Sequence, residues 1–211
     1  MVTSYPVTFD VEFPDRALGR LSSALRIFWL IPIAIVLSLV TGTSTHYATT
    51  SNGTTSTTTS LAAGGGVLFL PLVLMIVFRQ KYPRWWFDWN LQILRFTNRV
   101  TAYLALLYDQ YPSTDEEQAV HLDFPYPDAH QLNQWLPLIK WLLAIPHYIV
   151  LFFLYIGAVF AVIIAWFAIL FTGRYPRGLF DYVVGVMRWS NRVTGYAYTL
   201  VTDQYPPFSL R

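Results

Sequence analysis

The chain has 211 residues, of which 55% are hydrophobic and only 12% are charged, whereas a soluble domain carries about 25% charged residues. This composition favours a protein that folds in a lipid bilayer. The net charge of +2 is too small to indicate nucleic-acid binding, and the absence of cysteine excludes disulfides, thiolate chemistry and iron–sulfur clusters. Residues 1–14 contain no basic residue ahead of an apolar run, so we expect no cleavable signal peptide.

Two short segments, 7–13 and 120–124, alternate apolar and polar residues. A period of two residues is typical of a β-strand with one buried face. Each segment precedes a long apolar stretch, and we expect the two strands to pair antiparallel on the cytoplasmic side.

Two stretches lack charged residues, one between Arg26 and Arg79 and the other between Lys140 and Arg174. An ionised side chain at mid-bilayer costs about 2.5–3.5 kcal/mol, and one membrane span needs about 20 residues. The first stretch predicts two spans, separated by the Ser/Thr-rich residues 41–60. The second predicts two spans joined by a tight turn near residues 155–157. All Lys and Arg would then lie on one side, which the positive-inside rule makes cytoplasmic, together with both termini.

An amphipathic helix is predicted after each pair of spans, because apolar residues recur at alternating spacings of three and four. The same stripe could pack against protein or contact lipid at the interface. Its members are Trp86, Trp89, Ile93, Phe96, Val100, Tyr103 and Leu107, and then Leu179, Tyr182, Val186, Trp189, Val193, Tyr196 and Leu200.

The two halves of the chain resemble each other. Residues 82–107 and 175–200 share the sequence Tyr-Pro-Arg, a later Phe-Asp, and Asn-Arg-Val-Thr at an offset of 93, and Pro32 matches Pro146 at an offset of 114. This pattern predicts a tandem duplication with one copy in residues 1–112 and the other in residues 113–211. The predicted fold is therefore an all-α integral membrane protein with minor β structure. It has four transmembrane helices in two hairpins, each followed by a long amphipathic interfacial helix, and short cytoplasmic strands.

The most distinctive polar element is a duplicated Arg-x-x-Asn-Arg motif. Its two arginines lie one helical turn apart and could clamp a phosphate, or they could form salt bridges with acids such as Asp10, Glu12 or Asp123. Duplicated aspartates precede each motif, and an interfacial ion pair with a nearby arginine is their ordinary explanation. The candidate lipid-binding or partner-binding residues are Arg95, Asn98, Arg99, Arg188, Asn191, Arg192, Asp88 and Asp181.

No catalytic, cofactor or metal motif is present: the sequence lacks a phosphate-binding loop, a nucleophile elbow and a dinucleotide fingerprint. His121, Asp123, Asp128 and His130 lie close together in sequence. A solvated polar loop explains them better than a metal site, because their spacing matches no metal-ligand pattern. We therefore expect no cofactor, no metal and no enzymatic activity.

The segment from Trp141 to Leu210, which contains AWFAILFTGRYPRGLFDYVVGVMRWSNRVTGYAYTLVTDQYPPFSL, closely resembles the bacterial membrane family known as domain of unknown function 4389. The first half resembles this family more weakly, which suggests two tandem copies. The resemblance implies a protein of the bacterial inner membrane and transfers no functional residues.

The sequence thus favours a non-enzymatic membrane accessory or scaffold protein, which binds membrane lipids, anionic lipid or a larger membrane protein complex at its cytoplasmic face. The alternative is a small transporter or channel built on a parallel repeat, although intramembrane polarity is sparse. A lipid-modifying enzyme has no positive support.

Overall fold

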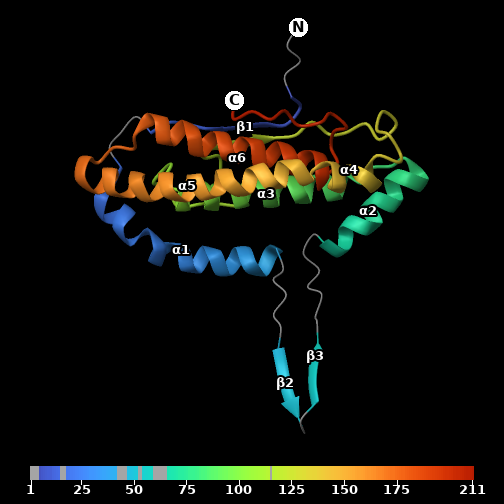
Figure 1. Cartoon of the computed structure of the whole chain (residues 1–211), viewed down its shortest axis with the longest axis horizontal. Helices are drawn as coiled ribbons and strands as arrows, with labels where there is room; N and C mark the ends of the chain where they lie inside the picture. The colour runs from blue at the N-terminus through green and yellow to red at the C-terminus, as the bar shows by residue number, and fades with distance from the viewer. Residues whose placement is uncertain (1–4, 15–17, 42–46, 52–53, 59–65, 115) are drawn as a thin grey trace.

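The computed structural model describes residues 5–14, 18–41, 47–51, 54–58, 66–114 and 116–211, and its long helices extend in roughly the same direction (Figure 1). In chain order, the elements are β1 (Thr8–Val11), α1 (Arg20–Thr41), β2 (Tyr47–Ser51), β3 (Thr54–Thr58), α2 (Gly66–Arg79), α3 (Arg84–Leu104), β4 (Val120–Asp123), α4 (Pro137–Leu143), α5 (Ile145–Thr172) and α6 (Arg177–Ala197).

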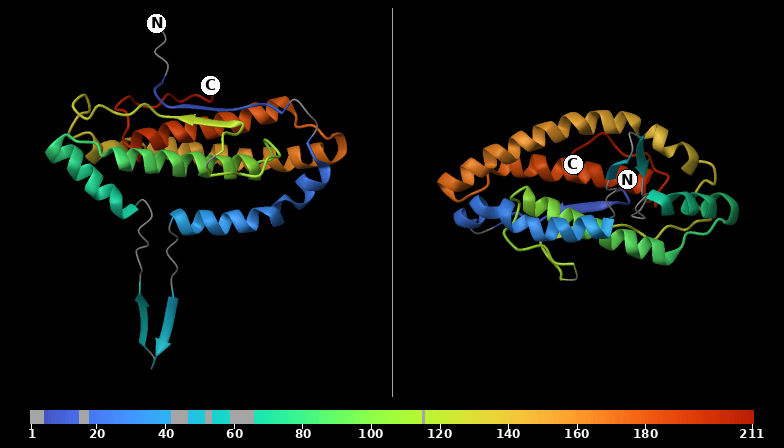
Figure 2. Two further views of the ribbon diagram at one scale, coloured as in Figure 1. Left: turned by 180° about the vertical axis from the view of Figure 1, so that it is seen from behind. Right: turned by 90° about the horizontal axis from the view of Figure 1, so that it is seen from below.

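The described elements form layers. The strands β1 and β4 lie on one side of α3 and α6, with β4 packed on α3 and β1 packed on α6. The helices α1 and α5 cover other faces of this central pair: α1 packs on α3, α5 packs on α6, and α1 also contacts α5 (Figure 2). Tyr5 and Arg211 both hydrogen-bond to Arg192 of α6, so the two described ends of the chain lie close together.

The two amphipathic helices begin and end in the same way. Pro83 and Pro176 precede α3 and α6 in an extended conformation, which suits a residue that cannot donate a backbone hydrogen bond. Shortly after each helix, Leu106 and Leu200 adopt a positive φ. Most of the predicted apolar stripe is buried, although Trp89 remains exposed. Packing against protein is therefore the main role of this stripe.

The predicted strands pair antiparallel as expected. Thr8 lies opposite Asp123 and Val11 lies opposite Val120, and the alternating side chains of Phe9 and Val11 are buried. The Ser/Thr-rich stretch also contains an antiparallel hairpin, formed by β2 and β3.

The prediction of four transmembrane helices in two hairpins is wrong. Residues 155–157, where the sequence predicted a turn, lie inside the continuous helix α5, which has 28 residues. Gly157 lies inside this helix, and its missing side chain makes room for the hydroxyl of Tyr182 on α6. In the described part of the chain, α5 is the one helix that is long and apolar enough to cross a membrane.

The helices α1 and α2 do not form the first predicted transmembrane hairpin. The described part of α2 has 14 residues, fewer than the roughly 17 that a span requires, and residues 61–65 of the predicted second span lie outside the described residues. The helix α1 begins with the polar residues Arg20, Ser22 and Ser23 and includes Arg26. The two helices do not lie side by side: α1 occupies one half of the molecule and α2 the other, with β2 and β3 extending away between them (Figures 1 and 2).

Candidate functional site

The arginines of the duplicated motif hold the strands in place. Arg95 on α3 donates from Nε to the carbonyl of Leu122 at 2.9 Å and pairs with Asp123 at 3.2 Å. Arg188 on α6 makes the corresponding contacts to the other strand, donating to the carbonyl of Phe9 at 2.8 Å and pairing with Asp10 at 2.8 Å. Of the alternatives that the sequence left open, the structure therefore contains the salt bridges to Asp10 and Asp123.

The second arginine of each motif bonds to main-chain carbonyls. Arg99 donates to Ser113 O at 2.8 Å, and Arg192 donates to Ser209 O at 3.3 Å and to Arg211 O at 2.5 Å. A phosphate bound between the paired arginines would have to compete with these internal hydrogen bonds.

The two motif asparagines meet at the contact between α3 and α6. Asn98 Nδ2 donates to Asn191 Oδ1 at 2.9 Å, and Asn191 Nδ2 donates back to Asn98 Oδ1 at 2.8 Å. Both side chains are buried, so this reciprocal pair specifies how the two helices cross rather than presenting a binding surface.

Asp88 and Asp181 are exposed and lie just after the first turns of α3 and α6. Asp181 forms the expected ion pair with Arg177 at 3.5 Å. Because α3 and α6 run in opposite directions (Figures 1 and 2), the two aspartates lie toward opposite ends of the helix pair and do not form one site.

A polar pocket of about 340 Å³ lies beside the two strands, and Arg95, Arg99, Glu117 and His121 are among its lining residues. His121 Nε2 lies 3.0 Å from Glu12, while Asp128 accepts hydrogen bonds from the backbone of His130 and the side chain of Gln131. The described residues contain no group of three or more His, Asp or Glu side chains that could hold a metal ion.

Two buried cationic side chains each lie in a polar site that the sequence analysis did not predict. The first is Arg26 on α1, which is only 2% exposed. Its guanidinium donates to the carbonyls of Tyr103 and Tyr108 at 2.9 and 3.0 Å, forms an ion pair with Asp109, and lies 4.4 Å from the centre of the Tyr103 ring. Asp109 also accepts a 2.7 Å hydrogen bond from the backbone of Gly19.

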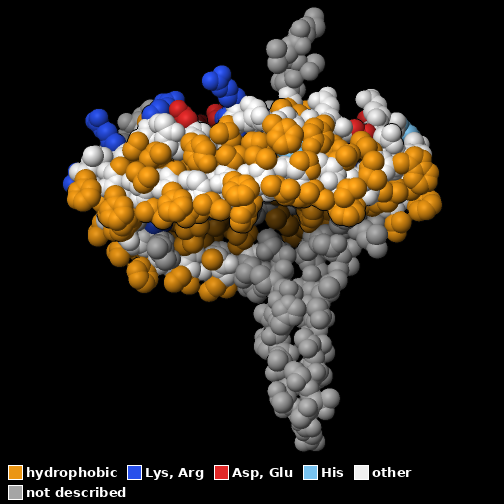
Figure 3. Space-filling view, in the orientation of Figure 1, with side chains coloured by type: hydrophobic (Ala, Val, Ile, Leu, Met, Phe, Trp, Pro, Cys, Tyr) orange, Lys and Arg blue, Asp and Glu red, His pale blue; other side chains and the backbone are white. Residues whose placement is uncertain are grey.

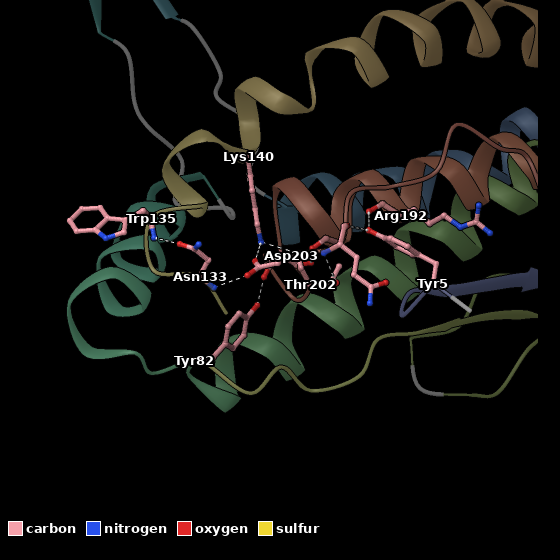
Figure 4. Close-up of polar contacts among 11 residues, drawn as sticks. Tyr5, Tyr82, Asn133, Trp135, Lys140, Arg192, Thr202 and Asp203 are labelled. Atoms are coloured by element: carbon pink, nitrogen blue, oxygen red, sulfur yellow. Dashed lines mark hydrogen bonds and ion pairs between the residues drawn. The ribbon is translucent and has the colours of Figure 1, made fainter. Parts of the chain in front are cut away.

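The second is Lys140 on α4, which is fully buried. Its ammonium lies 2.7 Å from Asp203, donates to the carbonyl of Thr202 at 2.8 Å, and lies 5.1 Å from the centre of the Tyr196 ring (Figure 4). Asp203 accepts a 2.6 Å hydrogen bond from the backbone of Asn133. Burial lowers the pKa of Lys140, while the Asp203 carboxylate opposes that shift.

The two cation sites therefore have the same design: a buried base, a carboxylate that also accepts a backbone N–H, a main-chain carbonyl and a tyrosine ring. The signal was available in the sequence, because the offset of 114 that aligns Pro32 with Pro146 also aligns Arg26 with Lys140. Lys140 bounds the second charge-free stretch of the sequence, and its side chain is buried against Asp203 instead of extending to the surface.

Comparisons with known proteins identify one family. No similar chain was found among curated proteins or among solved structures. One segment of the chain does match a known family, and it begins with α4 and includes α5, α6 and most of the C-terminal tail. Residues 137–209 match the family described as Domain of unknown function (DUF4389).

Proposed function

We propose that this protein is a non-enzymatic accessory or scaffold protein embedded in one leaflet of the bacterial plasma membrane. Its two halves are tandem copies of the same domain, and α5 lies along the membrane plane. The polar layer of strands and both chain ends face the cytoplasmic headgroups, where they bind a partner protein or anionic lipid.

The observation that carries the proposal is a broad apolar surface opposite a charged one. Large hydrophobic side chains are exposed along α1, α4 and α5, and charged side chains gather on the strand side (Figure 3). Contiguous exposed apolar surface of this extent marks a membrane or protein contact. Its members on α5 include Ile149, Phe152, Phe153, Ile156, Val159, Phe160, Ile163, Ile164, Phe167 and Phe171.

The packing of α6 against α5 favours an in-plane orientation over a spanning one. Tyr182 donates to the carbonyl of Leu154 at 3.0 Å, and Tyr155 donates to Ser190 at 2.7 Å, so α6 is fixed against the middle of α5. Arg188, paired with Asp10, lies on the same part of α6. If α5 crossed the bilayer, these charges would lie near mid-bilayer depth, where each costs about 2.5–3.5 kcal/mol.

The polar layer supplies the binding surface in this proposal. The pocket beside the strands contains Arg95 and Arg99, and Arg99 is buried with its Nε unpaired among the described residues. A carboxylate or phosphate oxygen would satisfy that donor. The transporter or channel alternative was based on a parallel repeat of membrane spans, and α5 is the one candidate span among the described residues.

The test is a depth measurement on single cysteines, which the chain permits because it has no native cysteine. Spin labels on Phe153→Cys, Phe160→Cys and Phe171→Cys, in vesicles of phosphatidylethanolamine and phosphatidylglycerol, report depth through relaxation by oxygen and by a water-soluble nickel chelate. An in-plane α5 places all three labels at similar depth. A spanning α5 places Phe160 deepest and Phe171 near a surface, which would overturn the proposal. A label on Glu117→Cys, on the polar side, serves as the aqueous control.

A further inference from the structure

A large apolar groove lies between the two halves of the described molecule. It has a volume of about 610 Å³ and is walled by residues of α1, α3, α5 and α6. This volume falls within the range of pockets that enclose a small organic ligand, about 300–1,000 Å³. The walls are almost entirely apolar; Ala158, Val162, Val186 and Met187 are representative.

The groove opens on the apolar surface. Val159, Ile163 and Phe167 line it and are also among the exposed side chains of α5. Its opposite wall is different, because Val183, Val186 and Met187 of α6 line the groove and are at most 5% exposed. A molecule that reaches these α6 side chains therefore has to enter the groove.

Part of the groove lining is polar, and two of its polar groups lack a hydrogen-bond partner among the described residues. Ser23 and Arg26 of α1 line the groove, each is 2% exposed, and neither Ser23 Oγ nor Arg26 Nε has a hydrogen-bond partner among the described residues. A buried donor without an acceptor costs about 1–3 kcal/mol. An oxygen acceptor on an apolar ligand would remove that cost.

We propose that the groove binds one acyl chain of a membrane phospholipid, with the ester carbonyl oxygen accepting a hydrogen bond from Ser23. An acyl chain matches the apolar walls, its ester matches the unpaired hydroxyl, and the opening faces the surface where such chains are found. This assignment rests on the proposed embedding in a leaflet and identifies a specific lipid contact within it.

The experiment uses the full-length protein in phosphatidylethanolamine and phosphatidylglycerol vesicles that contain a phospholipid with a diazirine at the end of one acyl chain. After photolysis, mass spectrometry locates the crosslinks. Occupancy of the groove predicts labelling of Val183, Val186 or Met187, whereas lipid that only surrounds the protein labels exposed residues such as Phe160.

Two tryptophan substitutions in α5 form a matched pair. Ala158→Trp fills the groove and should abolish labelling of α6 while labelling of Phe160 persists. Ile164→Trp, which is exposed and outside the groove lining, should leave both unchanged. Ser23→Ala should reduce α6 labelling about fivefold, the effect of one hydrogen bond.

The outcomes separate the two proposals. If Phe160 is labelled and α6 is not, the embedding stands and the acyl-chain site is wrong. If neither is labelled, the embedding itself fails. If a diazirine fatty acid labels α6 and the phospholipid does not, the occupant is a free acyl chain, and the assignment to phospholipid is overturned.

Discussion

Arg26 and Lys140 are long basic side chains whose heads are buried in the protein. Each is held by one carboxylate and one tyrosine ring, and by main-chain carbonyls, two for Arg26 and one for Lys140. A buried ion pair adds little net stability over an apolar replacement, but the loss of one partner leaves an uncompensated charge. The two sites should therefore tolerate paired replacement much better than single replacement.

Asp109→Ala tests this expectation. It leaves Arg26 buried without its carboxylate, and we expect the free energy of unfolding to fall by about 3–5 kcal/mol, measured by denaturant titration in detergent micelles. The double variant Arg26→Met/Asp109→Leu removes both charges and should lose much less. Equal losses in the single and double variants would contradict the role assigned to the pair.

The buried tyrosines predict a loss of stability at alkaline pH. Burial raises the pKa of the Tyr82 and Tyr175 phenols above their ordinary value of 10. Because the unfolded chain then ionises first, the stabilisation is complete below pH 10 and is lost as the pH rises above it. Thermal unfolding between pH 8 and 11 should show a falling midpoint.

The variants Tyr175→Phe and Tyr82→Phe separate the contribution of hydroxyl ionisation at alkaline pH from that of hydrogen bonding at pH 7. The Tyr175 hydroxyl has no partner among the described residues, so its removal should leave stability at pH 7 unchanged or higher. The Tyr82 hydroxyl donates to Thr199 O, and its loss should cost about 1–3 kcal/mol at pH 7. In both variants the midpoint of thermal unfolding should fall less steeply between pH 8 and 11. If the slope is unchanged in both, ionisation of these tyrosines does not cause the loss of stability.

Residue roles were only partly predictable from the sequence. The ion pairs of Arg95 with Asp123 and of Arg188 with Asp10 were among the stated alternatives. The buried pair of Lys140 with Asp203 was not among them. Burial of a lysine depends on what packs over it, and local sequence does not report that packing.

At the scale of elements, two glycines of α6 serve close packing. A side chain at Gly185 would meet the backbone oxygen of Leu210 at 2.8 Å, and one at Gly195 would meet Val7 at 2.6 Å. From sequence alone, glycine indicates a residue that weakens a helix. In the structure, these two positions let the C-terminal tail and the segment before β1 lie directly on the helix.

Gly185→Ala and Gly178→Ala make a matched test on the same helix. Gly185→Ala should destabilise the protein by about 1–3 kcal/mol, because the backbone of Leu210 has to move. Gly178 has nothing within 4 Å of the added carbon, so alanine there should raise stability by up to about 1 kcal/mol. Thermal and denaturant unfolding in micelles would measure both. Stabilisation by both substitutions would contradict the packing role of Gly185.

Elements with a clear hydrophobic period could be predicted from the sequence. The long apolar run that forms α5 was wrongly divided into two spans. The strands and the two amphipathic helices appear where their periods indicated. The run that forms α5 has no period that marks a turn, and its single glycine is used for contact with Tyr182. Charge-free length alone does not distinguish two short spans from one long helix lying on the protein.

At the scale of the whole molecule, the two halves exchange their strands. β1 precedes the first helices but packs on α6, while β4 follows α3 and packs back on it. Arg188 and Arg95 fasten these exchanged strands, and the asparagine pair joins α3 to α6. Neither half contains all the partners of its own elements.

We therefore expect fragments 1–112 and 113–211, expressed separately in membranes, to be degraded rapidly by added protease. Co-expression should restore resistance, because the strands can then reach their helices. Limited proteolysis followed by mass spectrometry would measure this. A protease-resistant, monomeric fragment 113–211 would show that the exchange is not required for folding.

The strand exchange also has a consequence for synthesis on the ribosome. Asp10 and its partner Arg188 are 178 residues apart, and translation proceeds at about 5–20 residues per second, so β1 waits roughly 10–35 s for α6. During that interval α1 already carries exposed apolar side chains. We therefore expect the nascent chain to be sheltered, by lipid if the proposed embedding holds or by a chaperone, until its polar layer closes.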